Sequence, residues 1–248
     1  AVCAFSQTLK IDSIVNSKSG DEDPAVFAGV IQNGEIIYRN IKGMANLQHM
    51  VAADENTRSN IASTAKQFTA LMVLDLSQKG KLSLEDDIRD YFPNLYTDIK
   101  EEIKIRHLLT HTSGIRDYCD LLGLEGKAWW RRMGLDNDDV LKLISKQNTL
   151  AFSPGSDYQY SNTGYNILAE LVGKVTEEDF VDYSTRFFQD LGMTQTAFPN
   201  DYMEVIPNQA SPYSDWGDGV FQKYPSATST YGEGFLYTTL DDQLHYEQ

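Results

Sequence analysis

The stretch NIASTAKQFTALM, residues 60–72, decides how the rest of this chain is interpreted. It places Ser63 and Lys66 three residues apart, where apolar residues begin to recur at helical spacing. Side chains three residues apart lie on the same face of a helix. Two interpretations follow from this spacing. Ser63 is either an ordinary helix cap next to a surface lysine, or a nucleophile that Lys66 activates.

In the second interpretation the helix start itself supplies part of the chemistry. Its first N–H groups have no partner within the helix and lie at the positive end of the helix dipole. Ser63 Oγ would attack an acyl group while the Ser63 N–H helps to hold the developing oxyanion. Crowding by the dipole and by apolar neighbours lowers the proton affinity of a lysine, so Lys66 would accept the serine proton. The pattern S-x-x-K occurs by chance in many chains and does not choose between the interpretations.

A second stretch, SDYQYSNTGYN at residues 156–166, adds a tyrosine and an asparagine. Tyr160 and Asn162 lie in a predicted loop just before a helical pattern. The charged form of a phenol is favoured next to a cationic lysine, so Tyr160 would shuttle the proton from Ser63 to a leaving group. The Asn162 amide can donate to a substrate carbonyl and accept from Lys66. The alternative is a simple turn, because Ser, Asn, Thr and Gly are all common turn residues.

Length and composition disfavour several classes of protein. The chain has 248 residues, of which 41% are hydrophobic and 23% are charged, enough to bury the core of one large domain or two small ones. Its formal net charge of −15 disfavours binding to nucleic acid or to anionic lipid. No apolar run approaches the roughly 18 residues that a membrane span needs. The two cysteines make neither a disulfide framework nor a metal ligand set.

The N-terminal part of the chain predicts a tail, a helix and a hairpin. Residues 1–7, AVCAFSQ, are typical of a signal-peptide remnant or a disordered tail, and this favours a periplasmic or secreted location. Residues 7–18 have a helical pattern. Two β-rich runs then flank Asn33 and Gly34, a pair that is the strongest short signal for a hairpin.

The rest of the chain predicts mainly helices. Helical patterns cover 63–80, 83–92, 103–114, 163–174 and 176–193. Ser83 and Thr176 each begin a capping-box pattern, with an aspartate three residues later. Residues 197–231 have little periodicity and are expected to form surface loops, and a last helix begins near residue 238.

Four blocks, in a fixed order, carry a resemblance that neither motif carries alone: NIASTAKQFTA (60–70), IRHLLTHTSGIRDY (105–118), FSPGSDYQYSNTGYNILAELV (152–172) and LGMTQTAFP (191–199). From about residue 24 to its end, the chain resembles the serine β-lactamase and penicillin-binding-protein superfamily. Its class C β-lactamase branch is the most similar, with the related esterases, D-aminopeptidases and carboxypeptidases. The resemblance implies a bacterial serine hydrolase that acts through an acyl-enzyme on an amide, a lactam or an ester.

The resemblance also implies an α+β fold, in which an antiparallel sheet lobe and a helical lobe enclose a cleft. In this sequence the sheet lobe is expected at about 8–62 and the helical lobe at about 63–196. Residues 197–248 are expected to form loops and a truncated return. Together these parts would make a single β-lactamase-like domain over 8–248.

Four residues of this sequence match the functional residues of the family. Ser63 matches the nucleophile and Lys66 its lysine partner. Tyr160 matches the tyrosine of the Y-x-N motif, and Asn162 matches its asparagine, which binds substrate. Whether Lys66 or Tyr160 is the base stays open, and the two are treated as one coupled unit. The expected partner is a small-molecule or short-peptide substrate, with no nucleic acid.

Two histidines, His107 and His111, are the remaining candidates for chemistry. Their spacing of four residues would suit half of a metal site. No glutamate follows in an H-E-x-x-H frame and no third ligand is evident in the sequence. The resemblance implies a structural role for this block, and neither a metal nor a cofactor is expected.

The third motif of the family is not found in the sequence. It consists of Lys or His, then Thr or Ser, then Gly, on a strand that supplies a second oxyanion N–H and often a cation for a substrate carboxylate. Residues 229–248, STYGEGFLYTTLDDQLHYEQ, instead resemble the segment that precedes it, with Glu233 where the family has Gly. We therefore expect the C-terminal strands to be missing and a C-terminal segment to complete the site. The alternative is a non-catalytic fragment or binding domain that keeps the site residues.

Overall fold

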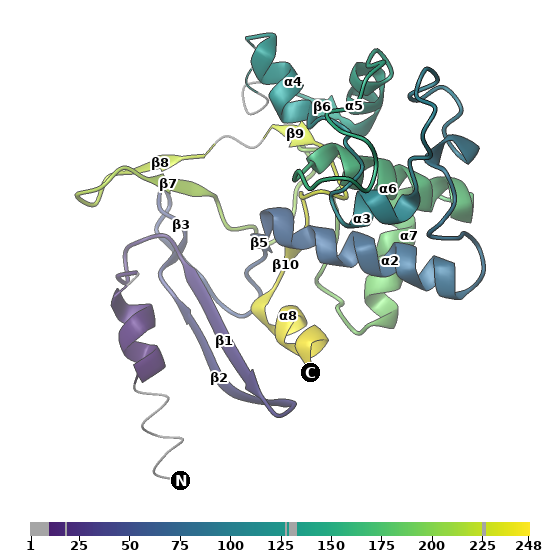
Figure 1. Cartoon of the computed structure of the whole chain (residues 1–248). Coiled ribbons are helices and arrows are strands. Elements are labelled where there is room, and N and C mark those ends of the chain that lie inside the picture. The colour runs from purple at the N-terminus through teal and green to yellow at the C-terminus, as the bar shows by residue number, and fades with distance from the viewer. Residues whose placement is uncertain (1–9, 18, 127, 129–132, 225–226) are drawn as a thin grey trace.

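The computed structural model describes residues 10–17, 19–126, 128, 133–224 and 227–248. Figure 1 shows a two-stranded hairpin on one side and a group of helices on the other, with the C-terminal helix α8 (Leu240–Glu247) beside the hairpin. Residues 10–17 are helical, as the pattern over 7–18 predicts. The tail predicted at 1–7 lies outside the described residues.

The N-terminal hairpin forms where the sequence predicts it. β1 (Val26–Gln32) and β2 (Glu35–Lys42) are antiparallel, and the turn between them places Asn33 at φ 54° and Gly34 at φ 80°. Positive φ at both central residues gives the turn a twist that matches the twist of the strands. A lone hairpin is marginal in water. Here α8 packs against β1 and buries Leu244 to 5% exposure.

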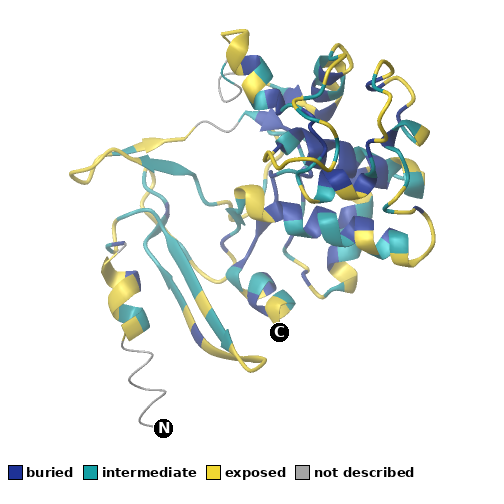
Figure 2. Cartoon of the chain, in the orientation of Figure 1, coloured by how far each residue is buried: buried dark blue, intermediate teal, exposed yellow. Residues whose placement is uncertain are grey.

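The main core lies among four helices: α2 (Lys66–Gln78), α3 (Ile105–Leu109), α6 (Asn162–Thr176) and α7 (Phe180–Asp190). Phe68 of α2 is fully buried and meets Phe188 of α7 edge to face, with ring centroids 5.4 Å apart. Figure 2 shows buried residues concentrated on these helices, whereas most hairpin residues are intermediate or exposed. Most of the hydrophobic stabilisation therefore comes from the helical side.

The remaining elements are short. They are α4 (Tyr118–Leu124), α5 (Asn137–Ile144) and the strand pairs β3 (Met44–Asn46) with β4 (Val51–Ala52), β5 (Ser59–Asn60) with β10 (Tyr237–Thr238), β6 (Leu135–Asp136) with β9 (Thr228–Ser229), and β7 (Tyr213–Asp215) with β8 (Phe221–Lys223). Residues 197–231, predicted as loops, therefore contain three short strands. The division into two lobes near residue 62 stays a prediction.

One of these small sheets brings the C-terminal part of the chain to the start of α2. β5 and β10 are antiparallel, and the Ile61 N–H donates to the Leu236 carbonyl at 3.0 Å. A 3-10 helix, η1 (Ala62–Ala65), follows directly and leads into α2. Residues 232–236 therefore run beside the helix start that holds Ser63.

Two predicted helix starts are wrong. The pattern over 83–92 yields only a 3-10 turn, η2 (Ile88–Asp90), because the backbone at 86–88 pairs with residues 103–105 instead of with itself. The capping box at Thr176 is also wrong. Thr176 ends α6, and Asp179 caps α7 by accepting from the Val181 N–H at 2.8 Å.

We expect Gly232 to tolerate no side chain. Its φ is 88°, and a Cβ there would lie 2.7 Å from the Tyr165 carbonyl oxygen, whereas Gly217, at φ 84°, has open space around it. Left-handed backbone costs other residues about 1–2 kcal/mol, and overpacking costs about 1–3 kcal/mol more. In urea unfolding, Gly232→Ala should therefore lower the free energy of unfolding by about 2–5 kcal/mol and Gly217→Ala by about 1–2 kcal/mol. Equal losses in the two variants would contradict this packing.

Candidate active site

Ser63 stands at a strained corner of the backbone. It lies in η1 directly after Ala62, whose φ of 47° is in the left-handed region. Such a conformation costs a non-glycine residue roughly 1–3 kcal/mol. The Ala62 N–H donates to Asn60 Oδ1 at 2.8 Å, which helps to hold this corner. Ser63 is exposed there and lines a cavity of about 600 Å³.

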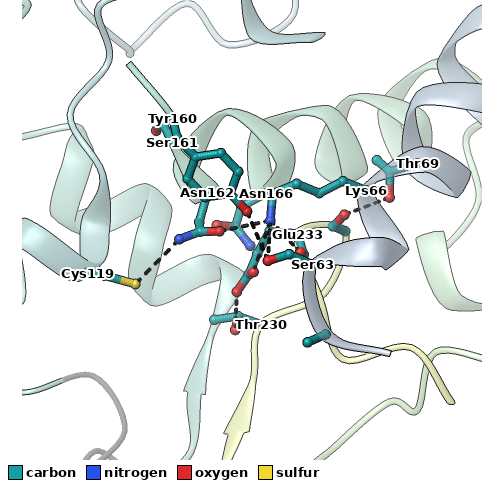
Figure 3. Close-up of polar contacts among 12 residues, drawn as sticks. Ser63, Lys66, Thr69, Cys119, Tyr160, Ser161, Asn162, Asn166, Thr230 and Glu233 are labelled. Carbon is teal, nitrogen blue, oxygen red and sulfur yellow. Dashed lines mark hydrogen bonds and ion pairs between the residues drawn. The ribbon is translucent and has the colours of Figure 1, made fainter. Parts of the chain in front are cut away.

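Lys66, at the start of α2, is buried behind the serine. Only 6% of its surface is exposed. Its Nζ donates to Ser63 Oγ at 3.1 Å, to Asn162 Oδ1 at 2.8 Å and to the Glu233 backbone oxygen at 2.6 Å. Figure 3 shows these contacts meeting at Nζ. An ammonium has three N–H donors, so it can make all three of these hydrogen bonds at once.

Tyr160 reaches the same serine from the loop before α6. Its hydroxyl donates to Ser63 Oγ at 2.9 Å, and its ring centroid lies 5.0 Å from Lys66 Nζ, within cation–π range. The His111 ring packs on the Tyr160 ring with 4.6 Å between centroids. The Tyr160 hydroxyl oxygen and Lys66 Nζ therefore both lie within hydrogen-bond distance of the serine oxygen, which is the reach that proton transfer requires.

Asn162 is held by the segment that leads into α4. Its backbone N–H donates to the Asp117 carboxylate, which also accepts from the Cys119 N–H at 2.7 Å. Its Oδ1 is used by Lys66, and its Nδ2 makes a long contact of 3.8 Å with Cys119 Sγ. Sulfur is a weak acceptor, so Nδ2 keeps the capacity to donate to a substrate carbonyl.

All four residues named from the sequence thus meet at one point: Ser63, Lys66, Tyr160 and Asn162. Ser63 and Tyr160 are 97 positions apart in the chain, and the packing of α2 against α6 brings their two stretches together. The catalytic roles of these residues stay predictions.

The two histidines that would suit half of a metal site are used inside the fold. His107 Nδ1 accepts from the Lys104 N–H at 3.2 Å, and His111 Nδ1 accepts from the Ser161 N–H at 3.2 Å. Burial is the main reason that the pKa of each imidazole is lowered, and the charge of Lys66 adds to the effect at His111. Both rings are therefore neutral near pH 7, as an acceptor nitrogen must be.

Sequence reasoning missed the part that Glu233 plays around Lys66. Glu233 Oε2 lies 3.5 Å from Lys66 Nζ, and only 15% of the Glu233 side chain is exposed. Its Oε1 accepts from the Tyr118 hydroxyl at 2.9 Å. Burial raises the pKa of this carboxyl, and the charge of Lys66 opposes the rise. The one signal in the sequence is that Glu233 stands where the resembling family has Gly.

The cavity in front of Ser63 is aromatic and acidic. Its lining includes the rings of Tyr118, Tyr160, Tyr224, Phe235 and Tyr237 and the carboxyl groups of Asp117, Asp120 and Glu233. None of the described residues that line it is Lys, Arg or His. A substrate therefore meets apolar ring faces and negative charge.

Comparison with known proteins assigns the family. The family profile described as Beta-lactamase matches residues 16–247. The chain belongs to the beta-lactamase family. Members of this family are serine hydrolases. The assignment confirms the resemblance that the four sequence blocks indicate.

Two Bacillus subtilis (strain 168) proteins are among its relatives, and they are named "Putative penicillin-binding protein PbpX" and "Penicillin-binding protein 4*". One is 29% identical over 223 residues, which cover 89% of this chain and 53% of that protein. The other is 31% identical over 171 residues, which cover 68% of this chain and 37% of that protein. The chain thus spans about half the length, or less, of the curated relatives it matches.

Solved structures agree on the fold. A penicillin-binding protein from Bacillus halodurans is 26% identical, with a TM-score of 0.76 over 95% of this chain and 70% of that one. An octameric penicillin-binding protein homologue from Pyrococcus abyssi is 23% identical, with a TM-score of 0.82 over 98% of this chain and 55% of that one. These likenesses confirm the predicted α+β fold of the β-lactamase and penicillin-binding-protein type.

Cys119 lines the cavity, but we expect its thiol to be unreactive. Burial, with the Asp117 carboxylate close by, raises its pKa well above the ordinary value. The thiolate is the reactive form, so a raised pKa slows alkylation. At pH 8, iodoacetamide should modify Cys119 at least about 10²-fold more slowly in the folded chain than in urea. Peptide mass mapping measures both rates, and equal rates would contradict the described environment.

Proposed function

We propose that this chain is the catalytic part of a serine hydrolase that forms an acyl-enzyme at Ser63. The observation that carries the proposal is the meeting of two groups at one oxygen. Lys66 Nζ lies 3.1 Å and the Tyr160 hydroxyl 2.9 Å from Ser63 Oγ. A serine that only caps a helix needs neither a buried lysine nor a tyrosine hydroxyl. The exposure of Ser63 to the cavity supports the same conclusion.

In the proposed reaction Ser63 Oγ attacks the carbonyl carbon of an amide, a lactam or an ester. The coupled pair Lys66 and Tyr160 enters the reaction with one of its two groups deprotonated, as a neutral amine or as a phenolate. That group takes the serine proton as the new C–O bond forms. The carbonyl oxygen takes the negative charge, which the Ser63 N–H stabilises, while Asn162 Nδ2 orients the substrate. Collapse breaks the bond to the leaving group, which receives the proton. Water then attacks the acyl-enzyme and releases Ser63 with its proton restored.

The charge of the cavity ranks the substrate classes. The classes considered are a β-lactam, a D-amino-acid-containing peptide and a small ester. A substrate carboxylate would face the exposed Asp120, with no cation among the described lining residues to offset it, whereas Glu233 is paired with Lys66 and Asp117 accepts from two backbone N–H groups. A neutral ester, or an amide that carries an ammonium group, avoids this repulsion and packs on the tyrosine rings. We therefore place neutral and amine-bearing substrates above carboxylate-bearing ones for this chain.

A C-terminal segment that completes the site is part of the proposal. In the family the third motif supplies a second oxyanion N–H, and removal of one such donor costs roughly 10²–10³ in rate. We therefore propose slow acylation by this chain alone and faster acylation with a segment that carries the motif.

We also propose a periplasmic or secreted bacterial location. The described residues form no helix that is both long enough and apolar enough to cross a membrane.

Labelling with a fluorophosphonate tests the proposed nucleophile. We expect intact mass to show a single adduct on the chain, because an activated serine attacks phosphorus without further substrate binding. The adduct should be absent in Ser63→Ala and retained in Thr64→Ala, a matched control that removes an exposed hydroxyl from the next position of η1.

Two results of this labelling experiment would contradict the proposed nucleophile. A folded chain with no adduct, or an adduct that persists in Ser63→Ala, would refute an activated Ser63 in this chain. The first outcome would favour the non-catalytic binding domain that keeps the site residues. A positive result leads to a panel of penicillins, D-alanyl peptides and nitrophenyl esters.

A further inference from the structure

Glu233 is a largely buried carboxyl group that the proposed reaction does not use. Its Oε2 lies 3.5 Å from Lys66 Nζ, and its side chain is 15% exposed, against 8% for Lys66. Two hydroxyls hold the other oxygen: Tyr118 donates to Oε1 at 2.9 Å and Thr230 at 3.2 Å. Figure 3 shows Glu233 directed at the lysine, with Thr230 behind it. Burial raises the pKa of the Glu233 carboxyl, whereas the charge of Lys66 and the hydrogen bonds from Tyr118 and Thr230 act in the opposite direction and favour its carboxylate form.

Lys66 has a physical need for such a group. A buried ammonium is costly unless it is both hydrogen-bonded and paired with an opposite charge. Its three hydrogen bonds go to a hydroxyl, a side-chain amide oxygen and a backbone carbonyl, all of them uncharged. Glu233 is the ion-pair partner of Lys66 in the described structure.

We propose that Glu233 is a positioning residue of this site, whose carboxylate keeps Lys66 in the ammonium form with its three N–H groups aimed at their acceptors. The inference rests on the serine hydrolase proposed above. Lys66 then enters acylation as a cation that stabilises the developing charge on Ser63 Oγ. Tyr160 is left as the member of the coupled pair that takes the serine proton, and it must do so as its phenolate, whose charge the Lys66 ammonium favours.

None of the other titratable groups described around Lys66 and Glu233 takes the place of Glu233 as the opposite charge for Lys66. Those that face Lys66 and Glu233 are His111, Asp117, Tyr118, Cys119, Tyr160 and Tyr165. Burial lowers the pKa of His111 and raises that of Tyr118, Cys119 and Tyr165, so these four are uncharged near pH 7. The second carboxylate, Asp117, is occupied by the backbone N–H groups of Cys119 and Asn162.

Glu170 provides a matched control for Glu233. It is a partly buried carboxyl group that accepts from a tyrosine hydroxyl, that of Tyr231, at 2.9 Å. Burial raises the pKa of Glu170, as it does for Glu233. Glu170 makes no described ion pair with Lys66 and does not line the cavity at Ser63. Glu170→Gln therefore imposes the same chemical change outside the site.

The test measures the charge of Lys66 by NMR of the chain labelled with 13C and 15N at lysine. The Lys66 signal is assigned by its loss in Lys66→Met. In Glu233→Gln the midpoint of the Lys66 titration should fall by about 1–3 pH units relative to the unaltered chain, because the opposite charge is removed. In Glu170→Gln it should not move. An unchanged midpoint in Glu233→Gln, or an equal fall in both variants, overturns the proposal.

This readout needs no turnover, so it separates the two proposals. Absence of a Ser63 adduct would refute the serine hydrolase, whereas an unchanged Lys66 titration would refute the role of Glu233. If Glu233→Gln alone does not fold, the double variant Lys66→Met/Glu233→Gln tests whether the failure comes from the unpaired charge of Lys66. Because this variant lacks both charges, it should again unfold cooperatively. If Lys66→Met folds and the double variant does not, Glu233 serves packing and the proposal fails.

Discussion

The burial of one ammonium group, Lys66 Nζ, constrains the rest of this structure. Only 6% of Lys66 is exposed, and a charge so far from water is tolerated only among acceptors and an opposite charge. Those partners come from η1, from the start of α6 and from Glu233, which are distant in the chain. The packing of α2 on α6 and the pairing of β5 with β10 both bring them to this one point.

The same arrangement separates the exposed Ser63 hydroxyl from the buried Lys66 ammonium. Ser63 is exposed to the cavity and Tyr160 is 43% exposed, whereas Lys66 lies behind them in the helical core. Electrostatic interactions are stronger where water is excluded. In the proposed reaction a cation held in that position would act on Ser63 Oγ with little screening by water, while a substrate would still reach the serine from the cavity. The strained backbone at Ala62 is part of the geometry that makes this possible.

Local signals predicted local structure well, and long-range contacts decided the rest. The turn at Asn33 and Gly34 sets its own backbone, so its hairpin could be predicted from the sequence. The two motifs at Ser63 and Tyr160 are weak separately, and their order among four blocks made them specific. Glu233 could not be placed, because its partner Lys66 is 167 positions away. The pattern over 83–92 misled for the same reason. The Ser83 N–H does donate to the Asp86 carboxylate, but pairing of the following backbone with residues 103–105 prevents a helix.

The central claim is that Lys66 and Tyr160 act on Ser63 as one unit, and a double-mutant cycle tests it most directly. The rate of fluorophosphonate adduct formation is measured for the chain, Lys66→Met, Tyr160→Phe and the double variant. Each single change should slow the reaction by about 10²–10⁴-fold. The double variant should be little slower than the slower single variant, because parts of one unit are not additive. Slowing by the product of the two single effects would contradict the account.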